Sequence, residues 1–232
     1  MKAYNSEIAV IIPCYNEEKT IASVINDHKS ALPQATIYVI DNNSSDKTGA
    51  IAAENGATVL FEKKQGKGNA VKNAFENIES NCYFLVDGDG TYPADKAKEM
   101  CNLILNNSAD MVIGDRLSSS YFEENKKILN SVGNIIIRKL INMLYKSNLS
   151  DILTGSRALS KSFVENIPKL SDGFEIETEF TIYALKNKLK ITEIVIPYKD
   201  RPEGSFSKIK IVDGLKIFKT VMKSILKNNN KK

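Results

Sequence analysis

The first 115 residues alternate short apolar runs with segments of helical length, and this alternation constrains the fold more than any other feature. The apolar runs have the length of buried strands and lie at residues 8–12, 36–41, 58–61, 83–86 and 111–114. Helix-length segments separate them and begin near Glu17, Ser45, Gly66 and Pro93. Such an order predicts an α/β fold: a mostly parallel, Rossmann-type sheet that is flanked by helices.

Polar residues follow three of these predicted strands at the point where each strand ends. They occupy residues 15–17 after the first strand, 41–43 after the second and 87–89 after the fourth. Ligands of parallel sheets bind outside the carboxyl ends of the strands. We therefore predict one binding crevice that all three segments line.

The segment Asp87-Gly88-Asp89 has the composition of a metal site. Two carboxylates separated by glycine can approach a hard divalent cation without crowding. The alternative is a simple turn, since Asp and Gly are both turn formers. Its position at a strand end favours Mg²⁺ or Mn²⁺, held by Asp89 and Asp87.

Five motifs in a fixed order resemble those of family 2 glycosyltransferases, which have the GT-A fold. The first four are the runs at residues 11–18, 41–46, 66–70 and 87–89. The fifth, at residues 201–208, is similar to the Arg…Gly…Ser-Lys loop of the dolichyl-phosphate mannose synthase-like branch. The resemblance covers residues 8–208.

The resemblance implies an inverting hexosyltransferase that uses a UDP- or GDP-sugar. Asp89 and Arg201 would act on the departing diphosphate, with a cation neutralising its growing charge. The residues implied to bind the donor are Pro13, Tyr15, Glu17, Asp41, Lys67, Asp87 and Lys208. Two positions depart from the family pattern: Asn42 replaces the usual second Asp, and Thr91 replaces a Gln of the mannose synthase branch.

The acceptor determines whether a base is needed. A glycan hydroxyl, as in surface polysaccharide assembly, requires one, and Glu177, with Glu175 and Glu179 nearby, is the candidate. A polyprenyl (dolichyl or undecaprenyl) phosphate is already an anion, because its second pKa is about 6. It needs cations instead, and the candidates for acceptor binding are Arg116, Arg138, Ser156 and Arg157. Each arginine alone is more often part of a structural salt bridge.

The second half of the chain is less regular. Helices are predicted at residues 128–145, 174–188 and 209–227, a strand at 191–197 and a loop at 151–157. We divide the chain into one catalytic domain, residues 1–208, with a nucleotide-sugar half (1–115) and an acceptor half (116–208). A basic amphipathic tail, residues 209–232, completes it.

Charge is concentrated at the end of the chain. From Lys199 onward ten basic and three acidic residues give +7, so the rest of the chain carries −3. In the last helix Ile211, Leu215, Phe218, Met222 and Ile225 fall on one stripe beside several lysines, a pattern typical of peripheral membrane contact. Alternatively, this helix and the one at 128–145 cover the sheet or form a homodimer contact.

The remaining composition excludes several classes. No stretch has the length and apolarity of a membrane span, and the three cysteines have no metal-like spacing, so we expect a cytoplasmic protein at most peripheral to the membrane face. The single histidine, His28, leaves little room for histidine-based catalysis. No GxGxxG follows the first strand, which excludes a dehydrogenase, and we expect no nucleic-acid partner. An inactive nucleotide-sugar-binding protein remains the non-enzyme alternative.

Overall fold

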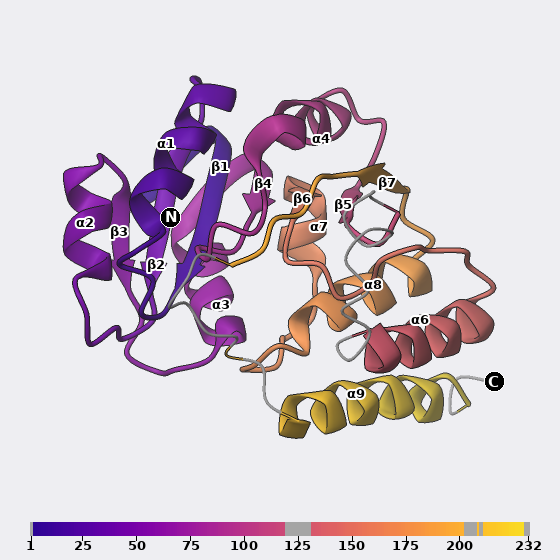
Figure 1. Ribbon diagram of the computed structural model, residues 1–232. Coiled ribbons are helices and arrows are strands. Elements are labelled where there is room, and N and C mark those ends of the chain that lie inside the picture. Colours follow the sequence, from indigo (N-terminus) through magenta and orange to yellow (C-terminus); the bar gives the residue numbers. More distant parts are fainter. Residues whose placement is uncertain (1, 119–130, 202–207, 209–210, 230–232) are drawn as a thin grey trace.

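The computed structural model describes residues 2–118, 131–201, 208 and 211–229. Its centre is a seven-stranded sheet with the order β3-β2-β1-β4-β6-β5-β7 (Figure 1). All neighbouring strands are parallel except β6, which is antiparallel to both β4 and β5. The strands are β1 (Tyr4–Cys14), β2 (Thr36–Asp41), β3 (Thr58–Phe61), β4 (Ile78–Leu85), β5 (Met111–Asp115), β6 (Arg157–Ser160) and β7 (Ile191–Val195). The predicted mostly parallel α/β sheet is confirmed.

Helices cover both faces of the sheet. They are α1 (Ile21–Ala31), α2 (Thr48–Glu54), α3 (Lys67–Asn77), the 3₁₀ turn η1 (Ala94–Lys96), α4 (Ala97–Leu105), α6 (Ser131–Tyr145), α7 (Lys161–Asn166), α8 (Ile176–Lys186) and α9 (Ile211–Asn229). Alternate residues of β1 face opposite sides: Val10 packs in a core with α1 and α4, and Ile11 packs in a core with α3 and α8. Residues 8–12 are fully buried for this reason, as a strand covered on both faces requires.

The segment from residue 151 to 166 differs from the prediction. The expected loop ends at Ser156, and Arg157 opens β6, which pairs with Leu85 of β4 and Ile113 of β5. Helix α7 follows at once, capped by the Ser160 hydroxyl, which accepts from the backbone N–H of Phe163 at 3.1 Å. The sequence Arg-Ala-Leu-Ser carries only two apolar residues, so its strand character comes from pairing with distant strands.

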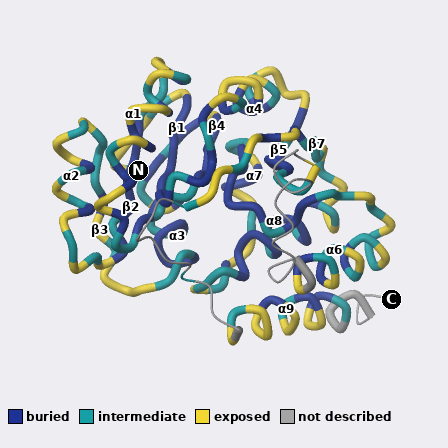
Figure 2. The backbone as a smooth tube through the Cα atoms, in the orientation of Figure 1, coloured by how far each residue is buried: buried dark blue, intermediate teal, exposed yellow. Residues whose placement is uncertain are grey.

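Helices α6, α8 and α9 form a second, smaller core beside the sheet. Ile137 and Ile141 of α6, Ile182 of α8, and Ile217 and Val221 of α9 pack together in it. Figure 2 shows α9 with buried residues toward α6 and exposed residues on its outer side. The predicted apolar stripe of α9 is therefore not its packing face.

Three residues of that predicted stripe are exposed, namely Leu215 (66%), Phe218 (44%) and Met222 (40%). Within the described part of the chain, no helix combines the length and the apolar character that a bilayer crossing requires.

Candidate active site

The segments predicted to share a crevice meet at one edge of the sheet, where β1, β2, β4, β5 and β7 end. Because β6 is antiparallel, it begins at this edge, and residues 154–156, which precede it, lie there as well. Just beyond β4, Gly88 packs against the end of β1: a Cβ there would lie 2.5 Å from the Cys14 sulfur, and the Thr20 hydroxyl donates to the Gly88 carbonyl at 2.6 Å. A larger residue at 88 would require the buried Cys14 side chain or the backbone between the two aspartates to shift.

Asp89 is almost completely buried, with 3% of its surface exposed. Its Oδ1 accepts from the backbone N–H and the hydroxyl of Thr91, at 3.1 and 2.7 Å. Its Oδ2 lies 2.5 Å from the Arg201 guanidinium. Thr91, which departs from the family pattern, thus fixes the orientation of Asp89, and the second carboxylate oxygen faces Arg201.

Lys67, the first residue of α3, bridges the two halves of the chain. Its ammonium lies 2.5 Å from Asp87 and 2.6 Å from Glu177, which is in the first turn of α8. Burial acts to lower the pKa of Lys67, but the two carboxylates outweigh burial and raise that pKa. Lys67 is therefore a permanent cation at this position.

Two glycines allow α3 to begin here. Gly66 has a φ of +130°, and a Cβ on it would lie 2.2 Å from the Asp172 carbonyl oxygen. A Cβ on Gly68 would lie 2.1 Å from the carbonyl oxygen of Ser171. The first turn of α3 thus packs directly against the backbone that leads into α8. This close packing brings the Lys67 side chain next to Glu177.

Glu17 lies after β1 and pairs with Lys208. Its backbone N–H donates to the Thr48 hydroxyl at 2.8 Å, which fixes the turn. Burial raises the pKa of Glu17, and the hydrogen bond and charge of Lys208 oppose that rise. The ammonium of Lys208 also bonds the Tyr15 carbonyl and lies 5.6 Å from the centre of the Tyr15 ring. The two predicted loop cations, Lys208 and Arg201, both reach the strand ends; residues 202–207 between them lie outside the described residues.

The end of β2 explains one departure from the family pattern. Asp41 accepts from the Ser44 N–H at 3.0 Å, and Pro13 lies beside β2, in register with Ile40. The Asn42 amide donates to the carbonyls of Glu62 and Lys64 at 3.1 and 2.8 Å, and its oxygen accepts from the Gly66 N–H at 2.7 Å. A carboxylate at position 42 cannot donate, so asparagine is the residue that holds the loop leading to Lys67.

Arg116, a predicted acceptor-binding residue, follows β5. Its guanidinium donates to both oxygens of the buried Asp151, at 2.7 and 3.1 Å. It also lies 5.8 Å from the ring centre of Tyr92 and 5.5 Å from that of Tyr198. The Tyr92 hydroxyl accepts in turn from the Gly155 N–H at 2.9 Å. Sequence reasoning missed Asp151, Tyr92 and Tyr198, because only the fold brings them to Arg116.

The other two arginine candidates contact residues 150–154, the segment that Arg116 contacts through Asp151. Arg157 is 1% exposed and donates to the carbonyls of Thr154 and Ile152 and to the Thr181 hydroxyl, at 3.2, 2.5 and 3.1 Å. Burial lowers the pKa of Arg157 to about 10. Ser156 is also buried, and half-buried Arg138 donates to the Ser150 carbonyl at 2.9 Å. Arg157 and Ser156 are thus both enclosed by the protein, and the guanidinium of Arg157 is held by backbone carbonyls.

The three glutamates considered as bases differ in their surroundings. Glu177 is held by Lys67, and Glu179 accepts from the backbone N–H and hydroxyl of Ser171 at 2.8 and 2.6 Å. Glu175 is 8% exposed, and its Oε2 has no hydrogen-bond partner in the structure. Of the three, Glu175 is the one with a buried carboxylate oxygen that has no hydrogen-bond partner in the described part of the chain.

The ion pairs at this edge bear on whether a metal fits. Four carboxylates (Glu17, Asp87, Asp89 and Glu177) face three cations (Lys67, Arg201 and Lys208), which leaves one excess negative charge. Among the described residues no group of three or more potential ligands forms a complete protein cage. Mg²⁺ characteristically takes one or two carboxylates and completes its shell with phosphates and water. The aspartate pair fits that kind of partial shell.

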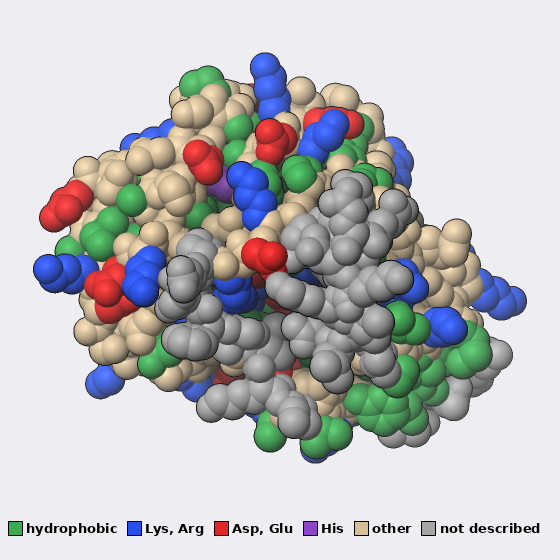
Figure 3. Space-filling model, in the orientation of Figure 1, with side chains coloured by type: hydrophobic (Ala, Val, Ile, Leu, Met, Phe, Trp, Pro, Cys, Tyr) green, Lys and Arg blue, Asp and Glu red, His purple; other side chains and the backbone are tan. Residues whose placement is uncertain are grey.

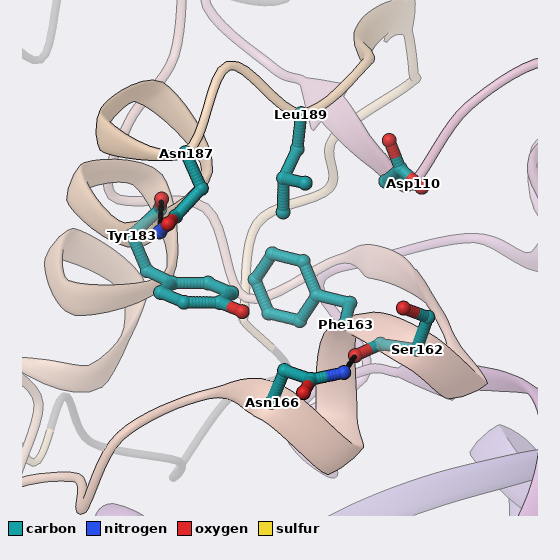
Figure 4. A pocket seen from close by; sticks show the side chains of 7 residues that line it. All are labelled: Asp110, Ser162, Phe163, Asn166, Tyr183, Asn187 and Leu189. Atoms are coloured by element: carbon teal, nitrogen blue, oxygen red, sulfur yellow. Dashed lines mark hydrogen bonds between the residues drawn. The ribbon is translucent and has the colours of Figure 1, made fainter.

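A separate pocket lies away from these charges. It has a volume of about 440 Å³ and is lined by Phe163, Tyr183 and Leu189, with Asp110 at its rim (Figure 4). Asp110 precedes β5, so this pocket is at the opposite edge of the sheet from Arg116. Its lining has a single carboxylate and no cation, and it offers no partner for the chemistry outlined above.

Comparisons with known proteins agree with this geometry. The chain is 36% identical to glycosyltransferase AglJ of Haloferax volcanii over 96% of its length and 73% of that protein. It is 30% identical to a dolichyl-phosphate hexose transferase of the same organism, over 95% of this chain and 94% of the relative. A solved structure of Mycobacterium tuberculosis glucosyl-3-phosphoglycerate synthase, in complex with Mn²⁺, UDP-glucose and phosphoglyceric acid, has the same fold. Its TM-score is 0.72 at 20% identity, over 96% of this chain and 79% of that one.

The profile described as "Glycosyl transferase family 2" matches residues 9–167, which include the ends of β1, β2 and β4 and the whole of β6. The chain belongs to glycosyl transferase family 2.

Proposed function

We propose that this chain transfers a sugar, with inversion, from a UDP- or GDP-sugar to a polyprenyl phosphate in a reaction that depends on Mg²⁺ or Mn²⁺. The observation that carries the proposal is the convergence of Asp89, Arg201, Glu17 and Lys208 at the carboxyl ends of the strands. The relative named as a dolichyl-phosphate hexose transferase supports the lipid-phosphate acceptor, since it matches over nearly the full length of both chains.

The charge balance of the site favours a donor that arrives with a cation. A nucleoside diphosphate sugar is an anion, and the cluster already has one excess negative charge. Asp89, with Asp87 beside it, would hold Mg²⁺ or Mn²⁺, which neutralises the diphosphate when bound. The related synthase with Mn²⁺ and UDP-glucose supports this assignment.

Arg201 and Lys208 would change partners when the donor binds. Each now neutralises a carboxylate, and each has a side chain long enough to turn toward a diphosphate oxygen. Charge accumulates on the diphosphate as the bond to the anomeric carbon breaks, so cations placed beside it stabilise the transition state more than the ground state. Tyr15, Asp41 and Pro13 would line the nucleoside side of the same edge.

The acceptor assignment follows from what Glu177 does. A hydroxyl acceptor needs a base to remove its proton, whereas a phosphate monoester is already ionised near neutral pH. Glu177, the expected base, is bound by the Lys67 ammonium at 2.6 Å and is 6% exposed. Arg116 lies beyond β5 on the side where the acceptor would enter, and we assign it to the acceptor phosphate.

The test compares two acceptors that differ in one group. The chain is incubated with UDP- and GDP-sugars and Mn²⁺, and with either a short-chain polyprenyl phosphate or the matching free polyprenol. We expect a glycosylated product, detected by mass spectrometry, with the phosphate alone. Transfer to the polyprenol, or only to an added glycan, would contradict the phosphate acceptor; a base would then be required, and loss of turnover in Glu177→Gln or in Glu175→Gln would identify it.

The proposal places the enzyme at the cytoplasmic face of a membrane, where a polyprenyl phosphate and a nucleotide sugar meet. We propose that residues 1–208 form the catalytic domain, in which residues 1–115 bind the donor and residues 116–208 bind the acceptor. Residues 209–232 form the basic tail.

A further inference from the structure

Helix α9 carries three distinct stripes along its length. Ile217, Val221 and Ser224 are buried, and the exposed residues Leu215, Phe218 and Met222 recur at the same spacing on another side. Exposed lysines 216, 219 and 223 form the third stripe. A helix that needed only to cover the core would have one apolar stripe, so the second one calls for a partner.

The orientation of α9 is fixed by its neighbours. The Tyr145 hydroxyl of α6 donates to the Ser224 hydroxyl at 2.9 Å, and the Lys186 ammonium of α8 donates to the Ser224 carbonyl at 3.1 Å. Together with the buried Ile217 and Val221, these bonds prevent α9 from turning its exposed apolar stripe inward.

Helix α6 extends the exposed apolar surface. Ile136 and Met143 lie two turns apart on one side of α6 and are 53% and 70% exposed. Figure 3 shows hydrophobic side chains gathered over α6 and α9 on the same face of the molecule. Lys139 is exposed between Ile136 and Met143, so this helix also combines apolar and basic groups.

We infer that the α6–α9 face, formed by Ile136, Met143, Leu215, Phe218 and Met222 with the neighbouring lysines, docks on an anionic lipid surface. Apolar side chains would enter the boundary between headgroups and acyl chains, and the lysines would reach the anionic headgroups. Asp213, the acidic residue in the first turn of α9, lies 3.5 Å from Lys216 and has a mostly buried side chain, so it opposes this attraction little.

Charge distinguishes a lipid surface from a second copy of the chain. A two-fold dimer would place the same face of both copies together, and with it two sets of exposed lysines at short distance. An anionic bilayer instead supplies the complementary charge. The choice of a lipid rather than another anionic surface rests on the proposed function, because a polyprenyl phosphate acceptor is itself embedded in a membrane.

The absence of tryptophan from the chain gives a direct test. Phe218→Trp places a single fluorophore on the α6–α9 face, and Phe61→Trp places one at a matched exposed site at the end of β3, across the sheet. With phosphatidylglycerol vesicles at low salt, we expect a blue shift and quenching by brominated lipid for Phe218→Trp only. Neutral phosphatidylcholine vesicles or high salt should remove both signals.

A second variant measures the energetic contribution of the face. Phe218→Ser combined with Met222→Ser should reduce partitioning into anionic vesicles by at least about tenfold, while Phe61→Ser leaves it unchanged. No vesicle binding by the native chain, or binding that the double variant retains, would overturn the inference. A concentration-dependent dimer that the double variant abolishes, without any lipid binding, would assign the face to a second copy.

The outcome of the vesicle-binding measurement does not depend on the outcome of the transfer reaction. Vesicle binding requires no donor, so binding without turnover would leave the docking face standing and reject the proposed function. Conversely, the double variant should still glycosylate a short-chain polyprenyl phosphate in solution at the native rate.

Discussion

Residues 1–115, which we propose bind the donor, hold their charged residues in a different way from residues 116–208, which we propose bind the acceptor. In residues 1–115 the carboxylates lie just beyond the strand ends and pair with cations that come from α3 and from positions 201 and 208. In residues 116–208, Arg116 and Arg157 donate to oxygen atoms of the same part of the chain, namely those of Asp151 and of backbone carbonyls, and the centre of the Tyr92 ring of the first part also lies 5.8 Å from Arg116. The cations beside the strand-end carboxylates therefore lie where a ligand could displace them, whereas Arg157 is held in the interior and Arg116 is oriented by its two hydrogen bonds to Asp151.

The largest expected effect tests the donor side. Asp89→Asn should lower turnover about 10³-fold, because it removes a charge that faces both the cation site and Arg201. Initial rates of sugar transfer measure the change, and the unfolding temperature shows that the variant is folded. Asp95→Asn, at an exposed position in η1, is the matched control and should keep the native rate. Retention of a tenth or more of the activity by Asp89→Asn would remove Asp89 from the catalytic site.

The next effect concerns stability on the acceptor side. Arg157→Ala should lower the free energy of unfolding by about 3 kcal/mol, since it leaves two buried carbonyls and a buried hydroxyl without their donor. Urea denaturation measures this change in the free energy of unfolding. Arg138→Ala, which loses one hydrogen bond from a half-buried position, should cost about 1 kcal/mol. A stable Arg157→Ala protein with a raised KM for the acceptor would instead make Arg157 an acceptor ligand.

A smaller effect is expected where the two halves meet. Glu177→Gln should reduce turnover only about tenfold, because it weakens the position of Lys67 without removing a proton acceptor, whereas loss of a general base costs about 10²- to 10⁴-fold. The pH–rate profile should keep its shape. A near-total loss together with disappearance of the ionisation on the acidic limb would identify Glu177 as a base and favour a hydroxyl acceptor.

The smallest effect is a pH dependence of the free energy of unfolding that arises from the buried His28 in α1. Burial lowers the pKa of His28, the only histidine in the chain, so the unfolded state takes up a proton at a higher pH than the folded state. Stability should be full above the unfolded pKa of about 6.5 and should fall as the pH drops below it, by up to about 1.4 kcal/mol per pH unit. Urea denaturation between pH 7.5 and 5.5 measures this slope. His28→Gln should flatten it, and an unchanged slope would assign it to other groups.

Most strands of residues 1–115 could be predicted from the sequence, because the sequence signals for these strands are local. Apolar runs of strand length and the polar residues after them are contiguous, so the ends of β1, β2 and β4 were placed correctly. β6 and α7 were missed because β6 depends on pairing with β4 and β5, and Arg157 was placed in a loop for the same reason. The contact of Arg116 with Asp151, Tyr92 and Tyr198 has no local signal either, since these four residues come from four separate segments.

The close approach of α3 to residues 171 and 172 limits how the enzyme can move. The backbone of Gly66 and Gly68 packs directly against the backbone of residues 171 and 172. Between the two glycines, Lys67 pairs with Asp87 and with Glu177. A hinge that separated residues 1–115 from residues 116–208 would have to break the Lys67–Glu177 pair and leave the buried Glu177 without its cation. We therefore expect donor binding to rearrange the side chains of Arg201 and Lys208 rather than to open a hinge between the two parts of the chain.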